Sequence, residues 1–249
     1  MNDNIELAAQ ILADCGSAFV FTGAGVSTES GIPDFRSPGG VWSKYRIITY
    51  QEFLADYDAR KEQWALHRDL YEDFKHCEPN AAHYAIAQLY DKGSVQAVVT
   101  QNIDSFHQEA GVPDEHVLEL HGNEKKVICL SCSEMYGRDE IQKRLLEGTQ
   151  VPLCDKCGGI MKTTTIWFGE QLPKDAVDRS FELASQSDCC IVVGSSLQVY
   201  PAAMIPEQAV RSGAKLIIVN RDPTPLDNHA SALIRGKAGD ALTKLAKLV

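Results

Sequence analysis

The stretch TGAGVSTESGIPDFR, residues 22–36, follows an apolar run at 18–21 that is typical of a short buried strand. Its first half is rich in glycine, alanine, serine and threonine, so backbone N–H groups can approach a ligand closely. A strand that runs into such a loop is how phosphate-binding turns begin. The loop ends in PDFR, residues 33–36, where a rigid turn, a carboxylate, an aromatic ring and a guanidinium follow one another. These features predict a loop that binds a ligand.

Composition and charge argue against several classes of protein. The 249 residues include 24 Lys+Arg and 34 Asp+Glu, and the formal net charge of -10 argues against nucleic acid as the primary ligand. No apolar run approaches the ~20 residues of a membrane-spanning helix. The start MNDNIELAAQ lacks the basic residues of a signal peptide. We expect a cytoplasmic chain with no membrane partner.

Helical and strand-like patterns alternate along most of the chain, which indicates an α/β fold with a parallel sheet. Buried strands are predicted at 18–22, 95–100, 115–120, 163–168, 189–193 and 215–219. Helices are predicted at 4–15, 80–90, 174–186, 201–211 and 242–248. Two segments interrupt this pattern. One is helical and aromatic, from 42 to 74, with Thr49 and Glu52 spaced as a capping box, and the other, from 129 to 157, is rich in cysteine, glycine and charge.

Two Cys-x2-Cys pairs, Cys129 with Cys132 and Cys154 with Cys157, have the spacing of a tetrahedral zinc site. Because cysteine fills all four positions, no place is left for a catalytic water. We predict one structural zinc that stabilises a module too small to fold on its own core. Four ordinary thiols or two redox pairs are the alternatives. The remaining cysteines are interpreted as small core residues: Cys15, Cys77, Cys189 and Cys190.

The glycine loop departs from the dinucleotide fingerprint G-x-G-x-x-G, because Thr28 stands where the third glycine is expected. The acidic residue usual ~20 positions further on, at the end of a second strand, is also missing, since the helical segment occupies that region. An ordinary Rossmann dehydrogenase is therefore a poor fit.

Polar residues follow several of the predicted strands. In open α/β sheets ligands bind beyond the carboxyl ends of strands, where such residues would gather. Taken singly, each group could also be an ordinary turn. His121, beside Gly122 at a strand end, is a candidate base, whereas most of the other histidines are interpreted as helix-surface or loop residues. The other groups are Gln101, Asn102 and Asp104; Gly194, Ser195 and Ser196; and Asn220, Arg221 and Asp222.

Together the motifs resemble those of the sirtuins, NAD-dependent protein lysine deacylases, in the same order and over nearly the whole chain. They are GAGVSTESGIPDFR at 23–36, TQNID at 100–104, HG at 121–122, the four cysteines, FGE at 168–170, GSSLQVYP at 194–201 and the turn at Asn220. The resemblance implies a Rossmann-like NAD-binding domain made of residues 1–40, 80–125 and 161–249. It also implies a small domain made of a helical insertion at 41–79 and a zinc module at 126–160.

The resemblance further implies that NAD lies in the cleft between the two domains. His121 would be the general base, with Asn102 and Asp104 as further catalytic residues that, with Gln101, line the nicotinamide and ribose pocket. The rest of the cofactor site would comprise Gly23, Ala24, Gly25, Ser27, Thr28, Gly194, Ser195, Ser196, Asn220, Arg221 and Asp222, with Asp34, Phe35 and Arg36 in a mobile loop. A substrate peptide would enter as an added strand between Phe168, Gly169, Glu170 and Leu197, Val199, Tyr200.

The implied reaction transfers the acyl group of an acyl-lysine protein or peptide to ADP-ribose and releases nicotinamide, with deacetylation as the expected activity. Protein mono-ADP-ribosyl transfer and a zinc-stabilised NAD-binding scaffold without turnover are the alternatives. Sirtuins that remove succinyl or malonyl groups carry a tyrosine three residues before an arginine. Here the residue three positions before Arg68 is Ala65, so an acidic acyl chain is not expected. A solvated helix face is the expectation for His67 and Arg68, with a position facing the pocket as the alternative. Trp167 is expected to narrow the acyl-lysine channel or to pack beneath it.

Overall fold

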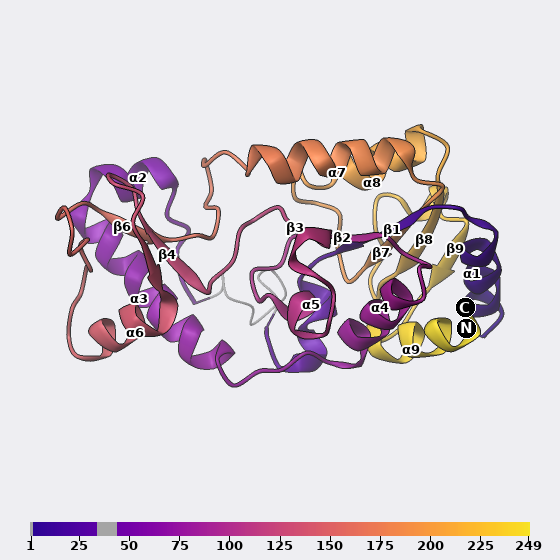
Figure 1. Cartoon of the computed structure of the whole chain (residues 1–249), viewed down its shortest axis with the longest axis horizontal. Coiled ribbons are helices and arrows are strands. Elements are labelled where there is room, and N and C mark those ends of the chain that lie inside the picture. The colour runs from indigo at the N-terminus through magenta and orange to yellow at the C-terminus, as the bar shows by residue number, and fades with distance from the viewer. Residues whose placement is uncertain (1, 34–43) are drawn as a thin grey trace.

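The structure, a computed structural model, describes residues 2–33 and 44–249. Figure 1 shows a larger part built on a parallel sheet and a smaller part that holds α2, α3, α6, β4 and β6. The sequence predictions for Asp34, Phe35 and Arg36 lie outside the described residues.

The larger part is organised around six parallel strands in the order β3-β2-β1-β7-β8-β9. Numbered among themselves, they follow the order 3-2-1-4-5-6 of the Rossmann fold, which confirms the predicted fold class. The strands are β1 (Ala18–Thr22), β2 (Ala97–Thr100), β3 (Val117–Glu119), β7 (Cys189–Val193), β8 (Lys215–Val219) and β9 (Ala232–Ile234).

Helices cover both faces of this sheet, so its strands are buried apolar runs. On β1, Val20 packs into one core with α1 (Asn2–Asp14), α4 (Ala81–Asp91) and α9 (Ala238–Leu248). Phe19 and Phe21 point to the other face, where α7 (Lys174–Gln186) and α8 (Met204–Arg211) pack. The two faces therefore follow from the period of two along the strand.

The smaller part joins the helical insertion and the cysteine segment into one core. Its helices are α2 (Tyr50–Ala55), α3 (Tyr57–Phe74) and α6 (Arg138–Leu146), and its antiparallel sheet has the order β5 (Met135–Gly137), β4 (Lys126–Cys129), β6 (Met161–Thr163). Phe53 and Trp64 from the insertion pack with Val127, Ile141 and Met161 from the cysteine segment. The two inserted segments therefore stabilise each other.

Several predicted boundaries need correction. The capping box of Thr49 and Glu52 is confirmed, but the helices of the insertion begin only after it. The strand expected at 163–168 is wrong: β6 ends at Thr163, and the Ile166 N–H donates to the His121 carbonyl as the chain crosses to the larger part. Strand β9, the small antiparallel sheet and helix α6 were not predicted. Within 2–33 and 44–249, no helix is long and apolar enough to cross a membrane.

Candidate active site

A cavity of about 1290 Å³ lies between the larger and smaller parts. It runs along the carboxyl ends of the strands of the large sheet, where ligands bind in this class of fold. Residues that follow β1, β2, β3, β7 and β8 line one wall, and residues of α3 and of the 165–172 segment line the other. Most of the residues predicted from the sequence to bind a ligand therefore face the same space.

The loops after β1 and β7 touch backbone to backbone at the point where the strand order reverses. The Gly25 N–H donates to the Gly194 carbonyl at 2.8 Å. A Cβ on Gly25 would lie 2.7 Å from that oxygen, and one on Gly194, whose φ is +60°, would lie 2.2 Å from the Val26 nitrogen. Thr28 replaces the third glycine of the fingerprint, and its hydroxyl donates to the Gly25 carbonyl at 2.9 Å. Glycine is therefore needed where the two loops cross.

Gln101 links the loops that follow β2, β1 and β7. Its backbone N–H donates to the Thr22 carbonyl at 3.0 Å, and its side-chain amide donates to the Ser195 hydroxyl at 2.9 Å. Ser196 also lines the cavity. These contacts hold the polar groups of three strand ends in one place.

Ser27 and Asp104 lie behind the cavity wall rather than in it. The Ser27 hydroxyl, whose residue is only 1% exposed, donates to Asp104 Oδ2 at 2.7 Å and accepts from the Asn102 amide at 2.9 Å. Asp104 Oδ1 accepts from the Phe106 N–H at the start of α5 (Phe106–Glu109). Among these, Asn102 lines the cavity. Ser27 and Asp104 thus orient the Asn102 side chain.

His121 follows β3 and lines the cavity. Its Nδ1 lies 2.9 Å from the Gln101 carbonyl oxygen, which can only accept a hydrogen bond. Nδ1 therefore carries the proton, and in the neutral ring Nε2 has the lone pair. This tautomer is the one that a general base needs.

The predicted substrate-binding residues line the cavity, with one exception. Those in the lining are Phe168, Gly169, Glu170, Val199 and Tyr200. Leu197 is 2% exposed and packs in the core beneath.

A buried ion pair holds the FGE segment in place. Lys162 Nζ lies 3.1 Å from Glu170 Oε1, and Glu170 Oε2 accepts from the Trp167 N–H at 3.0 Å. Burial lowers the pKa of Lys162, and Glu170 opposes that effect. Lys162 and the Trp167 N–H thus anchor Glu170, which itself lines the cavity.

The far end of the cavity is formed by residues after β8. Asn220, Arg221 and Asp222 line it, and the Asn220 amide donates to the Asp222 carbonyl at 2.8 Å. Arg235, after β9, donates to the carbonyls of Asn220 and Asp222. Arg235 was not predicted, because the short strand before it has little sequence signal.

Three histidines expected on surfaces or loops are buried, so that interpretation is wrong for them. His67 is 5% exposed, His83 0% and His107 1%. His83 lies 3.3 Å from the Ser27 hydroxyl, and burial lowers its pKa to about 4 although Asp104 acts against this. Asn80, the N-cap of α4 three residues earlier, donates its N–H to His83 Nδ1. The Asn-x-x-His capping box can be recognised in the sequence, and it was the signal that could have indicated a structural position for His83.

His67, from α3, and Trp167 both line the cavity. The solvated helix face expected for His67 is wrong, because its ring stacks on Trp167 with 5.5 Å between centroids and both line the cavity. Trp167 also packs edge-on against Phe53 at 4.3 Å. Arg68 points elsewhere, its side chain 43% exposed and paired with Asp69. Trp167 thus both narrows the cavity and packs beneath it.

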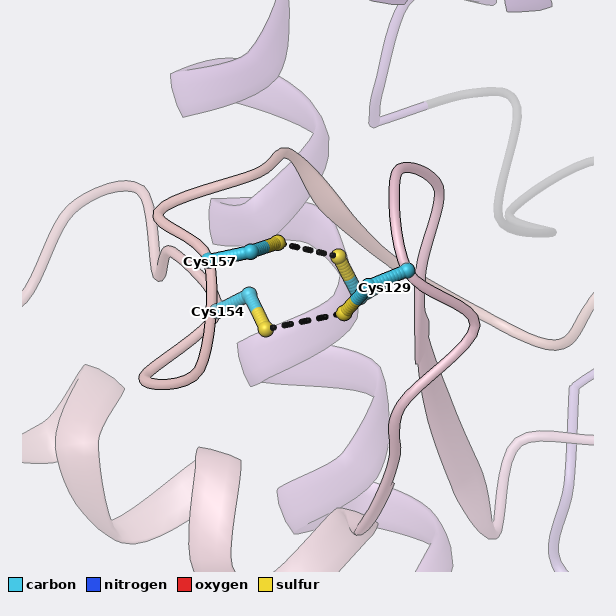
Figure 2. Close-up of side chains that lie close together, drawn as sticks. Cys129, Cys154 and Cys157 are labelled. Atoms are coloured by element: carbon cyan, nitrogen blue, oxygen red, sulfur yellow. Dashed lines mark hydrogen bonds between the residues drawn. The ribbon is translucent and has the colours of Figure 1, made fainter.

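The four cysteines meet at one point, as their spacing predicts. Their sulfur atoms all lie within 4.8 Å of one another, with Cys129 and Cys157 at 3.5 Å and Cys132 and Cys154 at 3.6 Å (Figure 2). Four thiolates at Zn–S bonds of ~2.3 Å on a tetrahedron lie about 3.8 Å apart. The donor set and its spacing therefore fit one zinc ion with no open coordination position.

The sequence pattern of the Sir2 family matches residues 23–201, from the glycine loop to the end of the substrate-binding segment. The chain belongs to the Sir2 family. A relative described as NAD-dependent protein deacylase 2 of Archaeoglobus fulgidus is 45% identical to this Sir2 protein, over 100% of the chain and 97% of the relative. An NAD-dependent protein deacetylase of Thermodesulfovibrio yellowstonii is 42% identical, over 100% of the chain and 96% of the relative.

A solved Sir2 structure with a deacetylated p53 peptide and 3'-O-acetyl ADP ribose superposes on this Sir2 chain with a TM-score of 0.91. It is 37% identical, and the match covers 98% of this chain and 97% of the other. The fold of this chain is thus that of solved Sir2 structures.

Proposed function

We propose that this Sir2 chain is an NAD-dependent protein lysine deacylase in which His121 is the general base. The observation that carries the proposal is the tautomer of His121: its Nδ1–H is taken by the Gln101 carbonyl, which leaves a basic Nε2 in the cavity wall. A positioned imidazole contributes typically 10²–10⁴-fold to such a reaction. The name and fold of the relatives support the same activity.

NAD, when bound, supplies the ribose carbon to which the acyl oxygen is transferred and the nicotinamide that leaves. The crossing at Gly25 and Gly194 lets backbone groups approach the phosphates. Ser195, Asn220, Gln101 and Asn102 all line the cavity that would hold NAD, and the Gln101 amide donates to the Ser195 hydroxyl. Ser27 and Asp104 hold the Asn102 amide in a fixed orientation.

An acyl-lysine peptide is the substrate that suits the mouth of the cavity. The segments 168–170 and 199–200 both line it, so an extended peptide can lie between them as an added strand. The lysine side chain then reaches past His121 toward the apolar side formed with α3. An apolar side of the cavity suits an acyl group, so it favours acyl transfer over ADP-ribosylation of a protein side chain. Acetyl-lysine is the expected substrate.

We further propose a cytoplasmic setting. None of the eight cysteines, all within residues 2–33 and 44–249, forms a disulfide, and four of them form the zinc-fitting quartet. A reducing compartment keeps such thiolates available for the metal.

His121→Ala tests the mechanism. We expect nicotinamide release with an acetyl-lysine peptide to fall by about 10²–10⁴-fold while NAD still binds, because the substitution removes the base but not the phosphate loop. Mass spectrometry should detect O-acetyl-ADP-ribose as the product of the unaltered protein. Undiminished turnover by the variant, or labelling of a protein acceptor in the absence of acyl peptide, would contradict the proposal.

A further inference from the structure

The acyl side of the cavity is apolar apart from one polar corner. Ile48, Leu66, Leu70, Ile166 and Trp167 line it. A second cavity of about 280 Å³ adjoins it, and the two share Ile48, Gln63 and Leu66 in their linings. The site therefore has room beyond an acetyl group, and Gln63 lies where the two cavities come together.

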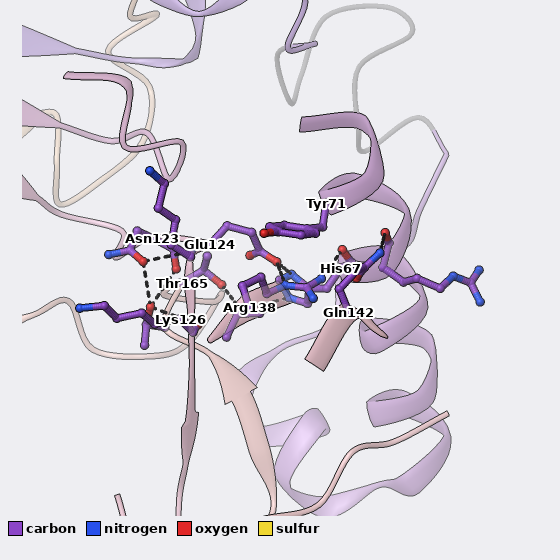
Figure 3. Close-up of polar contacts among 12 residues, drawn as sticks. His67, Tyr71, Asn123, Glu124, Lys126, Arg138, Gln142 and Thr165 are labelled. Carbon is purple, nitrogen blue, oxygen red and sulfur yellow. Dashed lines mark hydrogen bonds and ion pairs between the residues drawn. The ribbon is translucent and has the colours of Figure 1, made fainter. Parts of the chain in front are cut away.

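A chain of buried hydrogen bonds runs behind this wall to a carboxylate. The Trp167 indole N–H donates to the Thr165 hydroxyl at 2.8 Å, and that hydroxyl lies 2.6 Å from the Thr163 hydroxyl. The Thr163 hydroxyl lies 3.4 Å from His67 Nε2, and His67 Nδ1 lies 3.0 Å from Glu124 Oε1. Figure 3 shows His67, Glu124 and Arg138 together, where this row of hydrogen bonds ends.

Each proton in this chain can be assigned. Glu124 Oε1 also accepts from Arg138 Nε at 3.0 Å, so the carboxylate already balances a guanidinium and accepts from His67. His67 thus carries its proton on Nδ1, and Nε2 is an acceptor. Thr163 donates to His67 Nε2 at 3.4 Å and shares the one lone pair of that nitrogen with a closer neighbour, Gln63, at 3.1 Å, while Thr165 donates to Thr163 and Trp167 donates to Thr165. All of these bonds point toward Glu124.

This direction fixes the orientation of the Gln63 amide. Because His67 Nε2 is an acceptor, the group 3.1 Å from it must be the amide nitrogen of Gln63. The amide oxygen is then turned away from His67, and it has no hydrogen-bond partner among residues 2–33 and 44–249. Gln63 is 6% exposed and lines both cavities. The polar corner therefore offers an acceptor that needs a donor.

Beside Gln63, the described lining that α3 and residues 165–167 give the first cavity contains no cation for a negatively charged acyl group, whereas Lys44 and Arg46 line only the second cavity, where Arg46 pairs with Glu52 and Glu62. Arg68 is paired with Asp69 at the surface. Arg138 donates to Glu124 and to the His67 carbonyl, behind the wall. Lys162 is engaged by the Thr165 carbonyl and Glu170. A carboxylate here would meet the Gln63 oxygen without a counter-charge.

We propose that the acyl pocket prefers acyl-lysines whose acyl chain carries a hydroxyl group, with Gln63 as the residue that determines this specificity. The hydroxyl donates to the Gln63 amide oxygen, whereas a plain acyl chain of the same length leaves that oxygen buried and unpaired. The proposal rests on the proposed deacylase function. It ranks hydroxyacyl chains above plain chains of equal length, and both above succinyl.

The test compares one peptide sequence that carries butyryl, 2-, 3- or 4-hydroxybutyryl, or succinyl on the same lysine. We expect kcat/KM for at least one hydroxybutyryl peptide to exceed that for butyryl by about three- to tenfold, the size of one neutral hydrogen bond. Succinyl should be the poorest substrate. If all hydroxybutyryl peptides equal or trail butyryl, the specificity proposal is wrong while the deacylase function stands. If no peptide is turned over although NAD binds, the proposed function itself fails.

Gln63→Leu separates a specific hydrogen bond from a general effect on the pocket. We expect the ratio of kcat/KM for hydroxybutyryl to kcat/KM for butyryl to fall to about one in the variant, whatever its rate on butyryl, and thermal unfolding checks that the variant folds. Glu182→Leu, on the exposed surface of α7, serves as the matched control and should keep the preference. A preference that survives in Gln63→Leu would overturn the role assigned to Gln63.

Discussion

The glycine at position 25 shows how much a single missing Cβ can decide. An added methyl group would lie 2.7 Å from the Gly194 oxygen and 2.8 Å from its Cα. The backbones of the two loops would have to separate, and overpacking of this kind costs about 1–3 kcal/mol. The glycine loop after β1, which we propose receives the phosphates of NAD, would move as the two backbones separate.

We therefore expect Gly25→Ala to weaken NAD binding and to lower the free energy of unfolding by about 1–3 kcal/mol. Gly137 is the control, because its φ is -67° and nothing lies within 4 Å of an added Cβ. Calorimetric titration with NAD and chemical denaturation check both. Equal effects from the two substitutions would contradict the steric explanation.

His83 makes stability depend on pH in a definite direction. Its pKa is about 4 in the folded protein because burial disfavours the charged ring, against an ordinary value of 6.5. Between these values the unfolded chain binds more protons than the folded one. The free energy of unfolding therefore falls as pH drops from about 6.5 to about 4, by up to about 3 kcal/mol for this residue.

Denaturation at several pH values checks this expectation. His83→Gln should flatten the loss of stability in that pH range, although it can lower stability at neutral pH by disturbing Ser27. His229→Gln, at an exposed position, should leave the slope unchanged. A His83→Gln slope as steep as that of the unaltered protein would show that the ring protonates freely in the fold.

At the level of elements, the cysteine quartet joins two turns of the small module. Cys129 ends β4, while Cys154 and Cys157 lie in a segment that is otherwise held by the bridge between Leu153 and Ile160 and by polar contacts such as those of Asp155 with Arg144 and Lys156 with Glu134. Metal binding free energy is thus folding free energy for this segment. The same core includes Phe53 and Trp64 of the insertion, so the loss should spread to the acyl wall.

We expect a strong chelator to lower the melting temperature and abolish deacylation, and added zinc to restore both. Cys157→Ser should reduce the zinc content below one ion per chain, whereas Cys77→Ser, outside the quartet, should not. Atomic absorption and thermal unfolding check the two variants. Full stability and activity in a protein free of metal would refute the structural role.

For the whole molecule, the sequence was most informative where local pattern and final environment agree. The ranges predicted for β7, β8 and α7 match the structure, because buried apolar runs and an amphipathic period are local signals. Strand β9 was missed because it has only three residues. The 163–168 strand was wrong because its backbone partner, His121, lies about 45 residues away.

The candidate site shows the same division. The glycine loop, His121, the polar strand ends and the cysteines could be identified from motif and spacing, and the structure brings them together. The placement of Ser27, Asp104 and Leu197 behind the cavity wall, and the burial of His67, depend on contacts between distant segments. No periodicity within α3 could show that Glu124 and Arg138 lie against His67.

The one-way chain from Trp167 to Glu124 also has a consequence for sequence variation. Each member has a fixed donor or acceptor role, so a single exchange such as Thr163→Val or Glu124→Gln leaves a neighbour without its bond. Compensation requires a second exchange at a contacting position. Across homologous chains, positions 67, 124, 138, 163, 165 and 167 should therefore change as a group or stay as they are, although α3, β6 and α6 are far apart in the sequence.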